Sequence, residues 1–291
     1  MYNIIGKYKI FLAISGVLIF TSITSLIIFG LKPGIDFTGG TMMKVEYQGD
    51  RPTVSEIQNK LKDLNLGDIT IQLVEERGVI LKFKVVDEET HQKILKSLGQ
   101  VQEISFESIG PTIGQELINK ARWAVILAVA AILIYVAWSF RKLSRLIKKG
   151  ESWRYGLGAI LALIHDVLVM LGLFAILGHF KGVEVNTSFI IALLTVLGYS
   201  VNDTIVVYDR IRENFLFYGG EKTETIINRS LNETIIRSLN TTLTTLLALL
   251  AIFFFGGETI KYFSLAMIVG IATGAWSSIS IATPFLLLKR R

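Results

Sequence analysis

The sequence predicts an α-helical polytopic membrane protein with six transmembrane helices and one small α+β domain outside the membrane. Hydrophobic residues make up 51% of the 291 residues and charged residues only 19%, and the mean hydropathy is +0.53. Such a composition is typical of a chain that lies in a lipid bilayer. The apolar residues gather in six runs, and the segment between the first two runs has the composition of a soluble domain.

The first apolar run extends from Ile10 to Leu31, which is about long enough to cross the hydrocarbon core. It is longer than the apolar region of a signal peptide and lacks a small-residue cleavage pattern, so we expect a retained membrane anchor. Five further runs are expected to span the membrane: Trp123 to Phe140, Tyr155 to Leu177, Thr187 to Val207, Leu239 to Phe255 and Tyr262 to Leu288.

Basic residues between the apolar runs predict the orientation of the chain. Cytoplasmic loops of membrane proteins carry an excess of lysine and arginine. This excess occurs between spans two and three, between spans four and five, and at the C-terminal end: Arg141, Lys142, Arg145, Lys148, Lys149, Arg154; Arg210, Arg212, Lys222, Arg229; Lys289, Arg290, Arg291. We therefore expect both termini in the cytoplasm. The net charge of +6 follows this pattern, so we expect no nucleic-acid partner.

The chain then divides into three parts. Residues 1–31 hold the first span, residues 121–291 hold the other five, and the segment 32–120 between them must face the outside. Alternating apolar residues predict strands at Thr41–Gln48, Ile69–Val74, Val79–Val85 and Val101–Ile109. Helical spacing predicts helices at Thr53–Leu66, which a Thr53 and Glu56 capping pattern opens, and at Glu88–Leu98, which Gly99 ends. The order βαββαβ predicts a ferredoxin-like module, a fold that hosts many functions.

Ionisable side chains inside membrane spans are costly, and they therefore mark candidate functional residues. There are four: His165 and Asp166 in span three, Asp203 near the cytoplasmic end of span four, and Arg237 at the cytoplasmic start of span five. Their expected depths in the membrane are comparable. A structural salt bridge of the aspartate, or snorkelling of the arginine to the interface, would explain each of them separately.

Polar and small residues share one helix face in three of the spans, which favours convergence of the four ionisable residues. These residues are Gly158, Ala162 and Asp166 on span three; Thr195, Tyr199, Asn202 and Asp203 on span four; and Arg237, Asn240, Thr241, Thr244 and Ala248 on span five. A single threonine of this kind usually serves only to pack helices together. A carboxylate, an arginine and a His-Asp pair that converge at one depth exceed what packing needs.

Such a cluster predicts proton coupling. Burial disfavours the charged form of an aspartate, whereas a nearby guanidinium favours it. Ionised Asp203 would hold Arg237 and protonated Asp203 would release it, which gives a two-state contact between spans four and five. A proton that crosses about 100 mV yields about 2.3 kcal/mol, and one pH unit adds about 1.4 kcal/mol. This is enough free energy to bias such a switch.

The sequence does not favour an enzyme. There is no cysteine, which excludes disulfides and cysteine zinc sites, and the three histidines are not spaced as a metal pair, so we expect neither a metal nor a cofactor. An intramembrane hydrolase would need a nucleophile with a base, or paired catalytic carboxylates. His165 and Asp166 are the only close candidates, and as sequence neighbours they are expected to point to different helix faces.

Four sequence motifs of this chain can be compared with those of known protein families. The first, Gly34-Ile35-Asp36-Phe37-Thr38-Gly39-Gly40, follows span one, and Gly39 and Gly40 can supply a turn with positive φ. The other three are His165-Asp166, the run from Gly198 to Arg210 that contains Asn202 and Asp203, and Arg237-Ser238-Leu239-Asn240-Thr241-Thr242. These four motifs resemble those of the SecD/SecF family of protein-export membrane proteins, in particular its SecF members. Together with the topology, the resemblance covers essentially the whole chain.

The resemblance implies a SecF-like subunit of a SecDF complex, which pairs with SecD and associates with the SecYEG channel. It also implies an RND-like half unit in the membrane, and use of the proton-motive force to pull preproteins outward after the SecA ATPase has pushed them. In that family the aspartate of span four and the arginine of span five are implicated in proton passage. By motif position these residues are Asp203 and Arg237, and sodium coupling in place of protons stays open.

A cell (inner) membrane of bacterial or archaeal type is the location that the resemblance implies, with membrane lipids and translocating preproteins as further partners. The main alternative is a proton-driven RND-type exporter of lipids or small molecules, which would share the six-span unit and the buried acid. The outer domains of such exporters are ordinarily much larger. One module of about ninety residues leaves little room for a substrate pocket.

Overall fold

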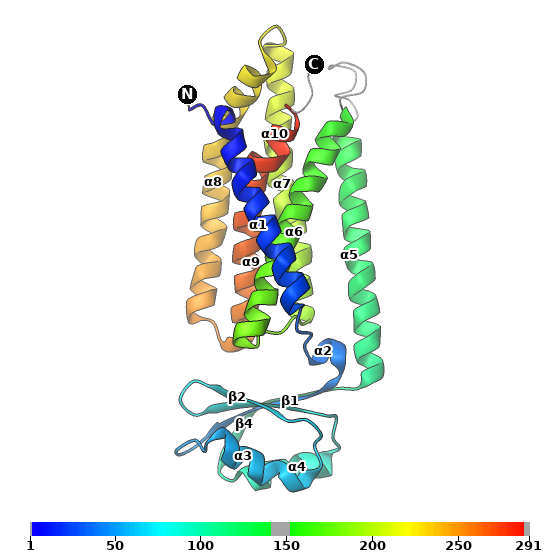
Figure 1. Ribbon diagram of the computed structural model, residues 1–291, viewed down its shortest axis with the longest axis vertical. Coiled ribbons are helices and arrows are strands. Elements are labelled where there is room, and N and C mark those ends of the chain that lie inside the picture. Colours follow the sequence, from blue (N-terminus) through cyan, green and yellow to red (C-terminus); the bar gives the residue numbers. More distant parts are fainter. Residues whose placement is uncertain (1, 141–151, 288–291) are drawn as a thin grey trace. The chain divides into compact units, whose positions relative to one another are not determined.

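A computed structural model describes residues 2–140 and 152–287, and it falls into two units (Figure 1). One unit comprises residues 1–32 and 123–291, and we name it the membrane unit; the other comprises residues 33–122, and we name it the outer unit after the location that the sequence predicts for it. Some of the basic residues that predict the orientation lie outside the described residues: Arg141, Lys142, Arg145, Lys148, Lys149, Lys289, Arg290 and Arg291.

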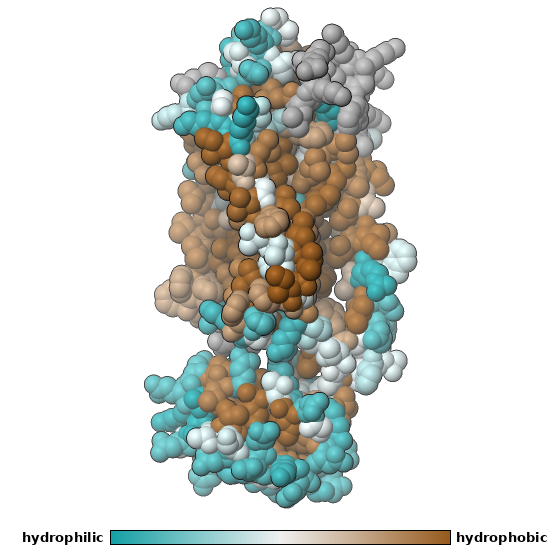
Figure 2. Space-filling model, viewed as in Figure 1, coloured by the Kyte–Doolittle hydropathy of each residue, from teal (hydrophilic) through white to brown (hydrophobic). Residues whose placement is uncertain are grey.

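Six helices of the described chain are long and apolar enough to cross a membrane, which confirms the predicted number. They are α1 (Tyr8–Phe29), α5 (Pro111–Phe140), α6 (Ser152–Lys181), α7 (Thr187–Phe217), α8 (Thr223–Phe255) and α9 (Glu258–Ser277). A 3₁₀ turn (Ile5–Lys7) precedes α1, and α9 continues through a π-helical segment (Ser278–Ala282) into α10 (Thr283–Phe285). Apolar side chains cover the visible face of the membrane unit along most of its length (Figure 2).

Three of the helices extend well beyond the predicted spans. One is α5, which begins at Pro111 instead of Trp123, and the other two are α7 and α8. The sequence predicts an end of span four at Val207 and a start of span five at Leu239, whereas α7 continues to Phe217 and α8 begins at Thr223. The additional turns carry polar residues that pair across the two helices. Arg210 Nε, for example, lies 2.7 Å from Glu233 Oε2. Hydropathy predicts only the part of a helix that lies in hydrocarbon, so it misses these polar ends.

Small residues permit close contact between the membrane helices. A Cβ atom on Gly172 of α6 would collide with Ser22 of α1, and one on Gly270 of α9 would collide with Val196 of α7. Gly158 of α6 likewise leaves no room for a Cβ atom, because the hydroxyl of a tyrosine from α7 occupies that space. The bundle therefore depends on close backbone approach, as is common in membrane proteins.

The outer unit contains one antiparallel sheet and two helices in the predicted order. They are β1 (Gly40–Tyr47), α3 (Val54–Leu61), β2 (Thr70–Val74), β3 (Gly78–Phe83), α4 (Glu88–Leu98) and β4 (Val101–Ile109), with a short helix α2 (Ile35–Thr38) before β1. The strand order is β2-β3-β1-β4, and Met43 of β1 lies opposite Leu81 of β3. These two side chains pack with Ile57 of α3 and Ile94 of α4 in a buried core. The ferredoxin-like assignment stays a prediction from this order.

The N-terminus of α3 is closed by the predicted capping box. The hydroxyl of Thr53 accepts a hydrogen bond from the backbone N–H of Glu56, and the Glu56 carboxylate accepts one from the backbone N–H of Thr53 at 2.7 Å. This backbone hydrogen bond is the main cause that lowers the pKa of Glu56. Its contribution to stability is therefore present at neutral pH and is lost as the pH falls through the lowered pKa.

Replacement of Thr53 with alanine should make α3 open more often, because it removes the acceptor that closes the first turn. We expect amide hydrogen exchange in residues 54–64 to become roughly fivefold faster, in line with the usual loss at an N-cap. Exchange measured by mass spectrometry on the full chain tests this, with the peptides of α4 as the internal control. Unchanged exchange in α3 would show that the cap does not limit its opening.

Candidate functional site

Asp203 lies on the buried side of α7, with 8% of its surface exposed. Its Oδ1 atom accepts a hydrogen bond from the hydroxyl of Ser238 on α8. Its Oδ2 atom is buried and has no hydrogen-bond partner within the described residues. A buried carboxylate oxygen without a partner is costly, and a bound proton removes most of that cost. The structure therefore places a carboxyl group that can take up a proton between two membrane helices.

The predicted contact between Asp203 and Arg237 is not formed in this structure. Successive residues of a helix point about 100° apart, so Ser238 faces α7 while Arg237 points outward and is exposed. Across residues 2–140 and 152–287 the Arg237 guanidinium makes neither an ion pair nor a hydrogen bond. In this arrangement Asp203 is held by a neutral hydroxyl instead of by a cation.

A second buried polar cluster surrounds Asp166 and joins α6, α7 and α9. The Nδ1 atom of His165 lies 2.9 Å from Asp166 Oδ1. The hydroxyls of Ser200 on α7 and Ser277 on α9 donate to Asp166 Oδ2 at 2.6 Å and 2.8 Å. All four residues are at most 1% exposed. The carboxyl group of Asp166 thus ties three membrane helices together.

The expectation that His165 and Asp166 point apart is wrong, because their side chains are in direct contact. Both side chains are short enough to turn toward each other at the same buried level of α6. Asp166 lies between the imidazole and the serine hydroxyls, and the other ring nitrogen of His165, Nε2, has no partner within the described chain. The imidazole therefore cannot take a proton from either serine, which disfavours a hydrolase of the Ser-His-Asp type.

The other polar residues predicted on spans four and five lie mostly on exposed positions of α7 and α8, and we name them the α7–α8 polar face. The Tyr199 hydroxyl donates to the Thr241 carbonyl at 2.9 Å and so connects the two helices. The Thr244 hydroxyl donates to the Asn240 carbonyl of its own helix. Except for half-buried Tyr199, all members of this face are exposed: Thr195, Tyr199 and Asn202 of α7, and Arg237, Asn240, Thr241 and Thr244 of α8.

Several serine and threonine residues that contact the two acids are absent from the predicted site. Ser200, Ser238 and Ser277 donate directly to the carboxylates, and the Thr204 hydroxyl lies 2.8 Å from that of Ser278. A single hydroxyl in an apolar helix usually bonds only to its own backbone, so its position alone does not reveal it. The one available signal is the dense Ser277-Ser278-Ile279-Ser280 run inside the last span.

The glycine motif after α1 forms a tight turn in the outer unit. Gly34 precedes α2, which contains half-buried Asp36, and the backbone N–H of Gly39 donates to the Ile35 carbonyl at 2.9 Å. Gly39 and Gly40 have φ angles of 72° and 128°, in the region that favours glycine. A Cβ atom on Gly39 would also lie 3.2 Å from Pro111. The predicted need for positive φ at both glycines is confirmed.

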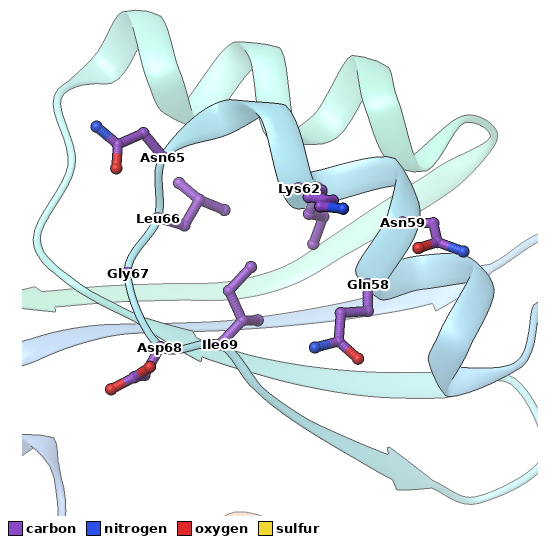
Figure 3. A pocket seen from close by; sticks show the side chains of 9 residues that line it. Gln58, Asn59, Lys62, Asn65, Leu66, Gly67, Asp68 and Ile69 are labelled. Carbon is purple, nitrogen blue, oxygen red and sulfur yellow. The ribbon is translucent and has the colours of Figure 1, made fainter.

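An open groove of about 520 Å³ lies beside α3 in the outer unit (Figure 3). Most of its lining is polar: Gln58, Asn59, Leu61, Lys62, Asn65, Leu66, Gly67, Asp68 and Ile69. Sites for lipids and drug-like molecules are usually enclosed and mostly apolar. The groove therefore does not favour the alternative of a small-molecule exporter.

Comparison with known proteins identifies relatives over nearly the whole chain. The model of the SecD/SecF protein-export membrane protein C-terminal family matches residues 90–291, and that of the SecD/SecF GG motif matches residues 24–50. The protein translocase subunit SecF of Thermobaculum terrenum is 41% identical, over 98% of this chain and 93% of the relative. That of Anaerolinea thermophila is 38% identical, over 99% and 94%.

A solved structure resembles the fold as well. The crystal structure of SecDF, a translocon-associated membrane protein from Thermus thermophilus, superposes with a TM-score of 0.85 at 32% identity. The match covers 98% of this chain, which spans 38% of the SecDF chain. SecDF in a super-membrane-facing form superposes with a TM-score of 0.69. From its motifs, its six membrane helices and these relatives, the chain belongs to the SecD/SecF family of protein-export membrane proteins and is similar to the SecF subunits within it.

Proposed function

We propose that the chain works as the SecF-type half of a SecDF complex, which uses the proton-motive force to assist the late movement of preproteins through the SecYEG channel. The observation that carries the proposal is Asp203, a buried carboxyl group between α7 and α8 with one oxygen free of hydrogen bonds within the described residues. When this carboxyl group takes up or releases a proton, the charge at the contact between α7 and α8 changes. His165 and Asp166 are proposed as further groups of the proton pathway.

Preprotein export into membrane vesicles tests this function. Vesicles that contain the chain with its SecD-type partner should export faster when a proton gradient is imposed. Collapse of the gradient with a protonophore should remove that gain and leave the ATP-driven part of export. Equal export with and without the gradient would contradict the proposal, and a gain that required a sodium gradient would point to sodium coupling.

The α7–α8 polar face supports a second membrane protein as the partner. Neither the Arg237 guanidinium nor the Asn240 amide makes a hydrogen bond within the described residues, although both lie on exposed positions of a membrane helix. Unpaired polar groups that face lipid are costly, so a protein surface that offers partners stabilises them. A homologous half unit of the SecD type, related by pseudo-symmetry, would offer such a surface.

Apolar substitutions on this face should weaken binding of the partner. We expect Asn240→Leu combined with Thr244→Leu to reduce co-purification of the SecD-type protein roughly fivefold, because interhelical polar contacts contribute about 0.6 to 2 kcal/mol each. Leu243→Ala, an exposed position on the adjacent stripe of α8, is the matched control. Full recovery of the partner with the double variant would show that the partner binds elsewhere.

The orientation of the chain follows in this proposal from its basic residues, with both termini in the cytoplasm. Two of the basic residues on the proposed cytoplasmic side, Arg210 and Arg229, lie in the hairpin of α7 and α8. Arg210 pairs with Glu233 and Arg229 pairs with Glu221. The outer unit would then face the extracytoplasmic side, where it could act on emerging preproteins.

Single cysteines can test the orientation without interference, because the natural sequence contains none. Gln48 is exposed after β1, and Gly220 is exposed between α7 and α8. We expect a membrane-impermeant maleimide to label Gln48→Cys in intact cells and to label Gly220→Cys only after the inner membrane is opened. The reverse pattern would invert the topology and remove the basis for an outward pull.

A further inference from the structure

The last membrane helix contains a π-helical segment that directly follows Ser277. Such segments are rare and often lie at functional sites, because they shift the backbone hydrogen-bond register. The Thr283 hydroxyl donates to the Ser278 carbonyl at 2.7 Å, and the Tyr208 hydroxyl of α7 donates to the Ala282 carbonyl at 2.8 Å. Side chains therefore satisfy two carbonyls of the segment and hold it in this register.

Ser277, which precedes this segment, and Ser278, its first residue, lie near the two buried acids. Ser277 donates to Asp166 Oδ2 at 2.8 Å. The Ser278 hydroxyl lies 2.8 Å from that of Thr204, the residue that follows Asp203 on α7. Adjacent residues of one helix thus bond to Asp166 and to the neighbour of Asp203 on α7, so a movement of this part of α9 changes the surroundings of both acids.

Each of the two serines also has a second acceptor within reach. The hydroxyl of Ser277 lies 3.1 Å from the Gly274 carbonyl, and that of Ser278 lies 2.9 Å from the same carbonyl. A hydroxyl bonds more strongly to a carboxylate than to a neutral carboxylic acid. When Asp166 takes up a proton, Ser277 can therefore transfer its hydrogen bond to Gly274, and the start of the π-helical segment loses its tie to α6.

The groups that face the two acids are few. Asp166 is faced by His165 of its own helix, by Ser200 of α7 and by Ser277 of α9. Asp203 is bonded to Ser238 of α8, and Thr204, which follows it on α7, is bonded to Ser278. Within the described residues, His165 is thus the one titratable group in hydrogen-bond contact with either carboxylate.

We propose that the Ser277–Ser278 step, with the π-helical segment that follows it, couples the charge states of Asp166 and Asp203, so that a proton on one carboxyl group changes the proton affinity of the other. The proposal deepens the proposed function, on which it rests for its role in transport. It makes Ser277 and Ser278 positioning residues. Protons would then bind the two acids in a set order as α9 changes register.

Infrared difference spectroscopy of the complex in lipid vesicles tests the coupling, because protonated carboxyl groups have a separate C=O band. The bands are assigned with Asp166→Asn and Asp203→Asn. Compared with the parent chain, the Asp166→Asn variant should change the proton concentration at which Asp203 is half protonated by about fivefold or more. When the chain already carries Ser278→Ala, adding Asp166→Asn should change this proton concentration by less than about twofold.

Two further variants keep the test decisive. Thr204→Val removes the hydroxyl partner of Ser278 without altering α9, and it should also remove the shift even if Ser278→Ala does not fold. Ser264→Ala removes a fully buried hydroxyl of α9 that bonds only to its own helix at Ile260, and it should leave the shift intact.

A shift that persists in both the Ser278 and the Thr204 variants would show direct charge repulsion and overturn the proposal. Absence of any shift in the parent chain would overturn it too. The titration needs no gradient and no preprotein. The two claims can therefore fail separately. If proton-driven export proved independent of Asp203, the proposed function would be wrong, whereas the titration would still show whether the two acids are coupled.

Discussion

Replacement of Asp203 with asparagine is expected to abolish the gain in export that a proton gradient gives, while the complex still assembles. Asparagine keeps the shape of the side chain, and its amide oxygen can still accept the hydrogen bond from Ser238. It cannot bind and release a proton at neutral pH. Loss of one proton driven by about 100 mV removes about 2.3 kcal/mol, which corresponds to about fiftyfold in the rate of a coupled step.

Export into vesicles with an imposed gradient, together with the yield of purified complex, provides the measurement. Asp209→Asn makes the same change at an exposed carboxylate of α7, one that pairs with Arg212, and serves as the matched control. If Asp203→Asn lowered the yield of complex while the surviving molecules still responded to the gradient, Asp203 would be a structural tie. The proton path would then run elsewhere, and Asp166 would be the next candidate.

Arg237→Ala is expected to impair export as well. Because the guanidinium is exposed in this structure, the loss can arise either from the switch with Asp203 or from the surface that binds the partner. If Arg237 and Asp203 act as one switch within the assembled complex, the double variant should lose no more export than Asp203→Asn alone. Additive losses would instead assign Arg237 to the surface that binds the partner.

Replacement of Asp166 with alanine is expected to destabilise the membrane unit strongly. The change leaves the Ser200 and Ser277 hydroxyls and the Nδ1 atom of His165 without their shared acceptor in a fully buried position. Leaving a buried polar group without its hydrogen-bond partner typically costs about 1 to 3 kcal/mol, and this change affects three such groups. Thermal unfolding in mild detergent should therefore begin at a clearly lower temperature than for the parent protein.

Asp166→Asn separates the structural role from proton transfer. Its amide oxygen can accept hydrogen bonds from both serines, so stability should stay within about 1 kcal/mol of the parent. Loss of gradient-driven export without loss of stability would place Asp166 on the proton path. Parent-like stability of the alanine variant would contradict the view that this carboxylate holds α6, α7 and α9 together.

Much of the fold is predictable because it depends on patterns of several residues. Six apolar runs predict six helices, and alternating residues predict the four strands in the right order. Local rules suffice for the Thr53 capping box and for the positive φ angles of Gly39 and Gly40. In each case the physical cause lies in neighbouring residues, so the sequence alone contains the information.

The site is harder to predict, because its geometry depends on how the helices rotate and pack. Depth in the membrane is enough to select Asp166 and Asp203. It does not show that Ser238 rather than Arg237 faces Asp203, since one residue along a helix turns the side chain by about 100°. The π-helical segment after Ser277 has no sequence signature either, so the proposed link between the two acids cannot be predicted from the sequence.

Proton movement itself is the most direct test of the central claim. Vesicles that contain the chain with its SecD-type partner, a pH-sensitive dye inside and an imposed pH gradient should show proton entry that depends on Asp203. We expect the parent complex to dissipate the gradient and the Asp203→Asn complex to behave like protein-free vesicles. Equal proton entry through both complexes would contradict the claim that Asp203 carries the proton.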